Sequence, residues 1–146
     1  WNTAINYAVP MVEGLNLYMG YANESSTGTR DDDTEITYGF DYSMGPVKIG
    51  YQESQVEDAT AAGDEVVAYG INFAVNDDLT VSYSATENTV NAHAATASSS
   101  SEATGLNASY SIGGGSIRIF TGEQDNAGYT SGVTKKHTEI SLSMSF

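Results

Sequence analysis

The stretch from Ile36 to Met44 reads ITYGFDYSM, and large apolar residues occupy every second position in it. Two further stretches, Val67 to Val75 (VAYGINFAV) and Leu79 to Ala85 (LTVSYSA), show the same alternation. A period of two is typical of a β-strand that presents one face to an apolar environment and the other to water. No window shows a comparable helical period, so we predict an all-β chain without helices.

Extending this pattern in both directions divides the chain into nine predicted strands, most of them longer than the typical five or six residues. Short turns alternate with long polar connections between them, and no boundary divides the chain into domains. The predicted strands are 1–9, 15–23, 34–44, 47–56, 65–75, 79–88, 103–112, 116–123 and 136–146, the turns are 10–14, 45–46, 76–78 and 113–115, and the long loops are 24–33, 57–64, 89–102 and 124–135.

Length and composition exclude several classes of protein. The chain has 146 residues and a mass of 15.4 kDa, which is one domain or part of one. Five basic residues against nineteen acidic ones give a net charge of −14. Nucleic-acid binding requires a basic stripe, so we exclude it as a function. The chain has no cysteine, which excludes disulfides, thiolate nucleophiles and cysteine-ligated metal sites.

The hydropathy of the chain leaves two environments open. A membrane-spanning helix needs about 20 consecutive apolar residues, and the sequence has no such run. A membrane-spanning strand needs only about 9 to 11 residues that are apolar at alternate positions, so a mean hydropathy of −0.29 is compatible with it. A soluble β-sandwich shows the same alternation, but its apolar side chains point into the protein core and its polar side chains point out into water. The alternation of short turns and long loops favours a barrel in an asymmetric membrane.

Two segments resemble the C-terminal part of a Gram-negative porin of the general diffusion type: Tyr38 to Tyr51 (YGFDYSMGPVKIGY), and the last strand, which ends ISLSMSF. The resemblance implies an antiparallel up-and-down transmembrane β-barrel in the bacterial outer membrane. It also implies a homotrimer that lets small hydrophilic solutes diffuse passively. In the last strand it assigns an assembly signal to Ile140, Leu142, Met144 and Phe146, with Met144 in place of the usual aromatic residue.

The parity of the strands makes a further prediction. Nine strands begin and end on opposite sides of a membrane, whereas bacterial single-chain barrels have an even number of strands. We therefore expect at least one strand before Trp1, and seven if the barrel has the 16 strands usual for porins. The constriction loop that the resemblance implies would lie in that upstream part.

If the apolar positions face lipid, the alternate positions face the barrel interior. The predicted pore-lining residues include both acidic and basic side chains. If Gly45-Pro46 is a two-residue turn, Ser43 lies opposite Lys48, and Asp41 is then a diagonal neighbour of Lys48 on the same face. The predicted pore-lining residues are Glu35, Asp41, Lys48, Gln52, Asn72, Arg118 and Glu139, and Asn16, Tyr18, Gly20, Ser82, Asn107 and Ser141 share their parity. With acidic outer loops at the mouth, this wall predicts a weak cation preference.

Other candidate sites are weaker. His137 and Ser141 have the same parity, but coincidence explains one such pair among many serines, so we expect no enzyme. Asp31, Asp32 and Asp33, in a predicted outer loop, are candidates for a divalent cation such as Ca²⁺ or Mg²⁺. A solvated acidic loop without a bound ion is the simpler interpretation. If a cation does bind, it could equally bridge these carboxylates to lipopolysaccharide phosphates. We expect no cofactor.

Three functions therefore stand beside one another. The first is a porin whose partners are outer-membrane lipid, lipopolysaccharide, two further copies of the chain and the outer-membrane assembly machinery. The second is a smaller barrel that anchors or supports the membrane without a through-pore, because barrels with few strands are filled by side chains. The third is a soluble secreted β-sandwich that binds a carbohydrate or a protein.

Overall fold

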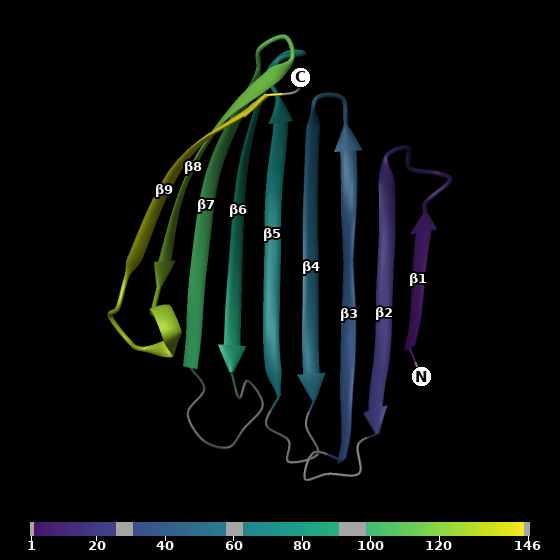
Figure 1. Ribbon diagram of the computed structural model, residues 1–146. Coiled ribbons are helices and arrows are strands. Elements are labelled where there is room, and N and C mark those ends of the chain that lie inside the picture. Colours follow the sequence, from purple (N-terminus) through teal and green to yellow (C-terminus); the bar gives the residue numbers. More distant parts are fainter. Residues whose placement is uncertain (1, 26–30, 58–62, 91–98, 145–146) are drawn as a thin grey trace.

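The computed structural model describes residues 2–25, 31–57, 63–90 and 99–144, apart from the side chains of residues 2, 24, 25 and 31–33. Each strand in it pairs antiparallel with the next along the chain, so that one sheet holds all nine in sequence order (Figure 1). The strands are β1 (Asn2–Ala8), β2 (Leu15–Ser25), β3 (Asp31–Met44), β4 (Val47–Glu57), β5 (Asp64–Ala74), β6 (Leu79–Val90), β7 (Ser99–Ser111), β8 (Gly115–Asp125) and β9 (Lys135–Met144). The predicted all-β, up-and-down topology is confirmed.

The two ends of the sheet differ, as the alternation of connections predicts. The short turns lie together at the upper end in Figure 1, which we call the turn end, and the strand ends that lead into the long connections lie at the opposite end, which we call the loop end. In the turn between β7 and β8, the Ile112 amide donates to the Gly115 carbonyl over 2.9 Å. Gly45 has φ +56°, a conformation that only glycine adopts without strain, so β3 can reverse into β4 in two residues.

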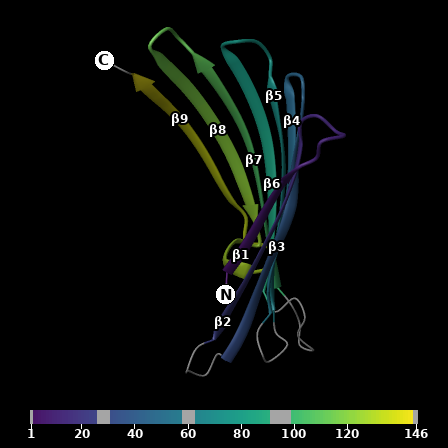
Figure 2. The ribbon, with the colours of Figure 1, turned by 90° about the vertical axis from the view of Figure 1, so that its right-hand side faces the viewer.

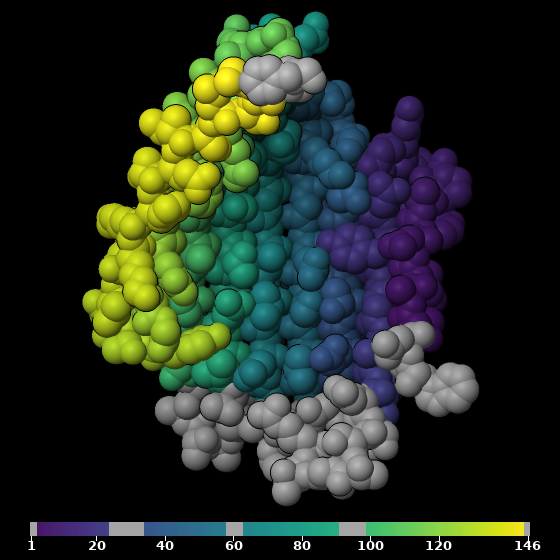
Figure 3. Space-filling model, viewed as in Figure 1, coloured from purple at the N-terminus to yellow at the C-terminus, as the bar shows by residue number. Residues whose placement is uncertain are grey.

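The sheet is open, and it is twisted and curved. Figure 2 shows β8 and β9 bending away from the middle strands. Strands β1 and β9 are the two edges and each pairs with one neighbour among the described residues; their side chains form the lateral borders of the face seen in Figure 3. Strand β1 begins at the loop end and β9 finishes at the turn end. This polarity is the one expected of nine antiparallel strands.

The sheet is a single layer with almost no interior. Only two apolar side chains in the described part of the chain are buried, those of Ala85 and Ala127, and Ser101 is the buried polar one. By contrast, Ile140 is 72% exposed although it is large and apolar. A soluble protein of this size buries such side chains, so the environment must supply the apolar contacts that the fold does not.

Several strands extend further toward the loop end than predicted. Asp31, Asp32 and Asp33 belong to β3 and not to a loop, and the serine run begins β7 at Ser99. Polar residues continue the backbone ladder here because its hydrogen bonds do not depend on side-chain hydropathy. Ser101, for example, pairs with Asn88 in the ladder between β6 and β7, and its hydroxyl also donates to the Asp125 carbonyl over 3.1 Å. The sequence prediction ended these strands where their apolar residues end.

The connection between β8 and β9 was predicted as a loop without helix, and this is wrong for one turn. Residues Ala127–Tyr129 form a 3₁₀ helix. Asn126, with φ +48°, starts this turn, and its side-chain oxygen accepts from the Gly132 amide over 3.1 Å. Ala127 is buried and its amide donates to the Val133 carbonyl over 2.8 Å. Local hydrogen bonds of an asparagine side chain produce such turns without any periodic signal in the sequence.

Candidate pore-lining face

The strand register assigns every residue to one of two faces, because directly paired residues of neighbouring strands point to the same side. One row of pairs runs from Lys48 through Asn72 and Ser82 to Asn107, and we call the side that carries this row the polar face. All seven predicted pore-lining residues lie on it, as the pairing across the sheet shows: Glu35, Asp41, Lys48, Gln52, Asn72, Arg118 and Glu139.

The opposite side, which we call the apolar face, carries most of the large exposed hydrophobic side chains of the nine strands; Val66, on the polar face, is an exception. Three residues of the predicted assembly signal lie on it in β9, and Phe146 lies outside the described residues. Among its exposed members are Ile5, Tyr7, Leu17, Met19, Tyr38, Met44, Ile49, Tyr69, Ile71, Phe73, Tyr83, Leu106, Tyr110, Ile117, Ile119, Ile140, Leu142 and Met144.

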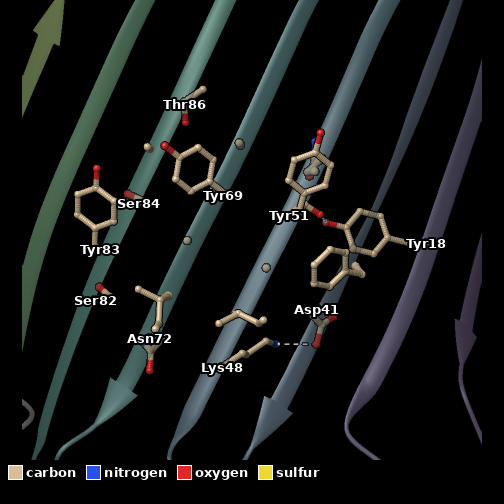
Figure 4. Close-up of a pocket in the computed structure, with 18 residues that line it drawn as sticks. Tyr18, Asp41, Lys48, Tyr51, Tyr69, Asn72, Ser82, Tyr83, Ser84 and Thr86 are labelled. Atoms are coloured by element: carbon tan, nitrogen blue, oxygen red, sulfur yellow. Dashed lines mark hydrogen bonds and ion pairs between the residues drawn. The ribbon is translucent and has the colours of Figure 1, made fainter. Parts of the chain in front are cut away.

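Near the turn end of the polar face, Asp41 connects two neighbouring strands. The Lys48 ammonium lies 3.2 Å from Asp41 Oδ1 (Figure 4). The Asn16 side-chain amide donates to the same oxygen over 3.1 Å. Ser43 pairs directly with Lys48 across the two-residue turn, so the predicted diagonal contact is confirmed. The positive charge of Lys48 is thus balanced by a carboxylate within the wall.

Arg118, on β8, has a different environment. Its Nε donates to Asn107 Oδ1 over 2.5 Å, and the Asn107 amide donates in turn to Ser82 Oγ over 3.4 Å. The guanidinium carbon lies 6.0 Å from the centre of the Phe120 ring, within the range of a cation–π contact. Within the described part of the chain, no carboxylate forms an ion pair with Arg118. Its charge therefore remains uncompensated on the polar face.

The remaining predicted residues are spread over the face. Gln52 donates to Ser54 Oγ over 3.2 Å, and Ser54 is 2.9 Å from the hydroxyl of Thr37. Glu35 lies nearer the loop end, paired with Ala22 and Val56. Glu139, on β9, is far from both along the sheet. The structure thus brings Asp41 and Lys48 together, but it does not gather the seven residues into one cluster.

Two aromatic rings on the polar face lie against glycines. A Cβ atom at Gly39 would meet the Tyr18 hydroxyl at 2.6 Å, and the ring of Phe120 covers Gly105 and Gly122 in the same way. Between the two rings, on β4 to β6, the face is hollowed over small residues, and Figure 4 shows the residues that line this depression. Sequence reasoning missed Phe120 because it is apolar, although its parity with Arg118 places it on this side.

His137 and Ser141, the pair considered for catalysis, both lie on the polar face of β9 and contact different partners. His137 Nε2 lies 3.6 Å from Glu139 Oε2, and Ser141 pairs with Arg118 across the sheet. The side chains of Asp31, Asp32 and Asp33 are outside the described part, and the residues within it contain no group of three or more potential metal ligands. No helix in the described residues is long and apolar enough to cross a membrane.

A single-layer sheet with one wet face and one apolar face is the wall of a membrane barrel, and comparison with known proteins agrees. A family model described as Gram-negative porin matches residues 1–146. The chain belongs to the Gram-negative porin family. Porins of this family lie in the outer membrane, generally as trimers, and are generally not enzymes. No curated protein matches this porin.

Proposed function

We propose that this porin forms a water-filled channel through which small hydrophilic solutes and ions diffuse passively. The observation that supports it best is the continuity of the polar face. Side chains with hydrogen-bonding groups run across the sheet from Asn16 on β2 to Ser141 on β9, and the apolar face lies behind them on every strand. A wall of this kind is stable when lipid covers one side and water the other.

Closure of the channel requires more than the nine strands. The edges of β1 and β9 would leave backbone groups unpaired in lipid, at several kcal/mol for each group. We infer that further strands pair with both edges and complete the barrel, and that three barrels associate in the membrane. We also propose that Ile140, Leu142, Met144 and Phe146 serve as the signal for the assembly machinery: the first three lie on the apolar face of β9, and Phe146 continues their spacing of two in the sequence.

The charges of the polar face suggest a modest selectivity. The described side chains of this face include four acidic and three basic ones, and the chain as a whole carries a net charge of −14. The acidic ones are Glu35, Asp41, Asp64 and Glu139, and the basic ones are Lys48, Arg118 and Lys135. Water in the channel screens these charges over about 8 Å at physiological salt. The field of the wall therefore changes ion concentrations near it without excluding either sign. We expect a weak cation preference.

The test is the conductance of the porin purified from outer membranes. In planar bilayers we expect discrete, long-lived steps whose size rises in proportion to salt concentration, together with sugar-induced swelling of liposomes that contain the porin. Correctly folded protein that inserts without any conductance would support the anchor barrel instead. Solubility without detergent would support the β-sandwich and would contradict both membrane functions.

A further inference from the structure

The neighbours of Arg118 on the polar face leave its positive charge in place. Ser109 on β7 and Ser141 on β9 pair with it directly, so hydroxyl groups and not carboxylates flank it in its row. Glu139 lies one pair further along β9, and its carboxylate contacts the His137 ring 3.6 Å away. Serine hydroxyls can donate hydrogen bonds without cancelling a positive charge. These surroundings therefore favour an anion.

The guanidinium is also held in one orientation. Its Nε donates to Asn107 Oδ1, and the Asn107 amide donates to Ser82 Oγ, so the acceptor is itself supported. The guanidinium carbon lies over the Phe120 ring, 6.0 Å from its centre. An arginine that stacks on an aromatic ring keeps the N–H groups at its edge available for hydrogen bonds. Part of the side-chain freedom that a ligand would have to remove is thus already lost.

The two terminal nitrogens of Arg118, Nη1 and Nη2, are the groups that remain available. Within the described part of the chain, no hydrogen bond or ion pair engages either of them, and the side chain is exposed. The parallel N–H groups at the end of a guanidinium match two oxygens of one carboxylate or phosphate, and such charged, forked bonds are strong ones. Chloride, with a single atom, cannot use this geometry.

The other described cations of the polar face provide a contrast. The Lys48 ammonium lies 3.2 Å from Asp41 Oδ1, so a carboxylate of the wall already occupies the position that an anion would take. Lys135 is the first residue of β9, at the loop end, and its ammonium is a point charge without a planar fork. Arg118 combines an orientation fixed by its neighbours with a charge that no described carboxylate pairs.

We propose that Arg118 is the centre of an anion-binding site on the polar face, which takes a small oxyanion of the carboxylate or phosphate class, with Asn107 as its positioning residue. This inference rests on the proposed function, since the anion enters the site from the water of the same channel. The site holds the anion against the wall and does not limit the width of the path. While the anion is bound, the positive charge of Arg118 is neutralised, so the channel prefers cations more strongly.

The experiment measures the reversal potential of porin purified from outer membranes. A fixed KCl gradient is kept across a planar bilayer while potassium phosphate is added equally to both sides. Binding should shift the potential toward cations, and the shift should saturate. Equal additions of KCl are the reference, because salt alone screens the wall and weakens its selectivity. Potassium acetate replaces phosphate in a second series, and the oxyanion that saturates the shift at the lower concentration identifies the preferred class.

The first pair of variants separates the site from the total charge of the face. Arg118→Gln should abolish the saturating shift. Lys48→Gln also removes one positive charge from the polar face, but it should keep the shift, since its ammonium is not part of the site. Only inserted porins contribute to the potential, so a variant that folds poorly lowers the current and not the shift.

The second set of variants tests the role of Asn107. Asn107→Asp keeps an acceptor oxygen for Nε but supplies a carboxylate partner to Arg118, so the shift should be lost. Asn107→Ala leaves the guanidinium without its tether and should need severalfold more phosphate for half of the shift. Asn72→Asp and Asn72→Ala are the matched controls, because Asn72 lies in the same row of pairs two strands away, and both should respond as the wild type does.

The outcomes separate the two proposals. If the wild-type porin does not conduct, the channel function itself is wrong. If it conducts but neither oxyanion produces a saturating shift, the polar face has no such site and the channel function stands. Equal losses in Arg118→Gln and Lys48→Gln would also overturn the inference, since the total charge of the face would then be responsible. An unchanged response in Asn107→Ala would remove Asn107 from the site.

Discussion

The polar and apolar faces are made by the same nine strands, yet residues that are adjacent in the sequence lie in opposite environments. Ile71 and Asn72 are adjacent on β5, both exposed, and on opposite sides of the sheet. On the apolar face, aliphatic side chains such as Ile140 and Leu142 are exposed, and they have no polar atom that could bond to water or to a neighbour. On the polar face, Lys48 and Arg118 are exposed but engaged, Lys48 in an ion pair with the half-buried Asp41 and Arg118 in a hydrogen bond to Asn107. Exposure in this sheet therefore has two meanings, contact with lipid and contact with water.

The difference teaches that the alternation of apolar and polar residues in this protein follows the medium outside each face, lipid or water, and not burial inside the fold. In a soluble protein, the apolar side of a sheet is covered by a second layer. Here there is one layer, and the apolar residues alternate as regularly as if a second layer were present. Lipid takes the place of that layer. The predictions that follow test whether the two faces respond to the same change in opposite ways.

The largest effect is expected at the chain end. Deleting Phe146 should reduce folded, surface-exposed porin severalfold, because the deletion removes the last position of the alternation Ile140, Leu142, Met144, Phe146. The measurement is the amount of heat-resistant porin per cell. Ser143→Ala, on the polar face of the same strand, is the control and should assemble normally. Normal assembly without Phe146 would mean that the machinery reads some other part of the chain.

A charge introduced on the two faces should have unequal costs. Ile71→Arg places a guanidinium in the middle of the apolar stretch of β5, where such a change costs about 2 to 4 kcal/mol in membrane barrels. Asn72→Arg, one residue further, adds the same group on the polar face and should leave stability almost unchanged. Urea-induced unfolding in lipid vesicles measures both. Equal losses in the two variants would contradict the assignment of the faces.

Reversing a positive charge should affect ion selectivity on one face only. Arg118→Glu replaces a cation of the polar face that has no ion-pair partner among the described residues, so the reversal potential in a salt gradient should shift toward cations. Lys136→Glu is the matched change on the apolar face, where Lys136 lies 2.9 Å from Glu123, and it should cause no shift. Lys48→Glu should also shift the potential toward cations. A shift with Lys136→Glu alone would mean that the faces are reversed.

The smallest effect is expected for the Asp41–Lys48 ion pair. Lys48→Met breaks the pair, but the lysine side chain is 57% exposed, and exposed ion pairs contribute about 0 to 1 kcal/mol to stability. The thermal stability of the porin should change little, and the change should diminish as salt is added. A large loss of stability would show that the pair is shielded from water, which the polar face as described does not allow.

Sequence reasoning identified the strands, their order and the two faces. It misplaced strand ends in segments where apolar and polar residues no longer alternate. It ended β6 too early and began β7 too late. The residues there, such as Thr89 and Ser101, are polar on both faces of the sheet, so no alternation of hydropathy marks them as part of a strand. It placed Asp31 in a loop for the same reason. It also passed over Phe120, since an apolar residue at a pore-lining position breaks the pattern on which the prediction depended.

What the sequence by itself determined is the parity of each strand. Successive side chains of a strand point to opposite sides whatever its neighbours are, so Asp41 and Phe40 had to be on different faces. Contacts between strands were decided only in the tertiary structure. Phe120 lies over Gly105, and Arg118 bonds Asn107, because β7 and β8 pair in one particular register. That register depends on backbone hydrogen bonds and turns that join the strands, and no property of a single strand contains it.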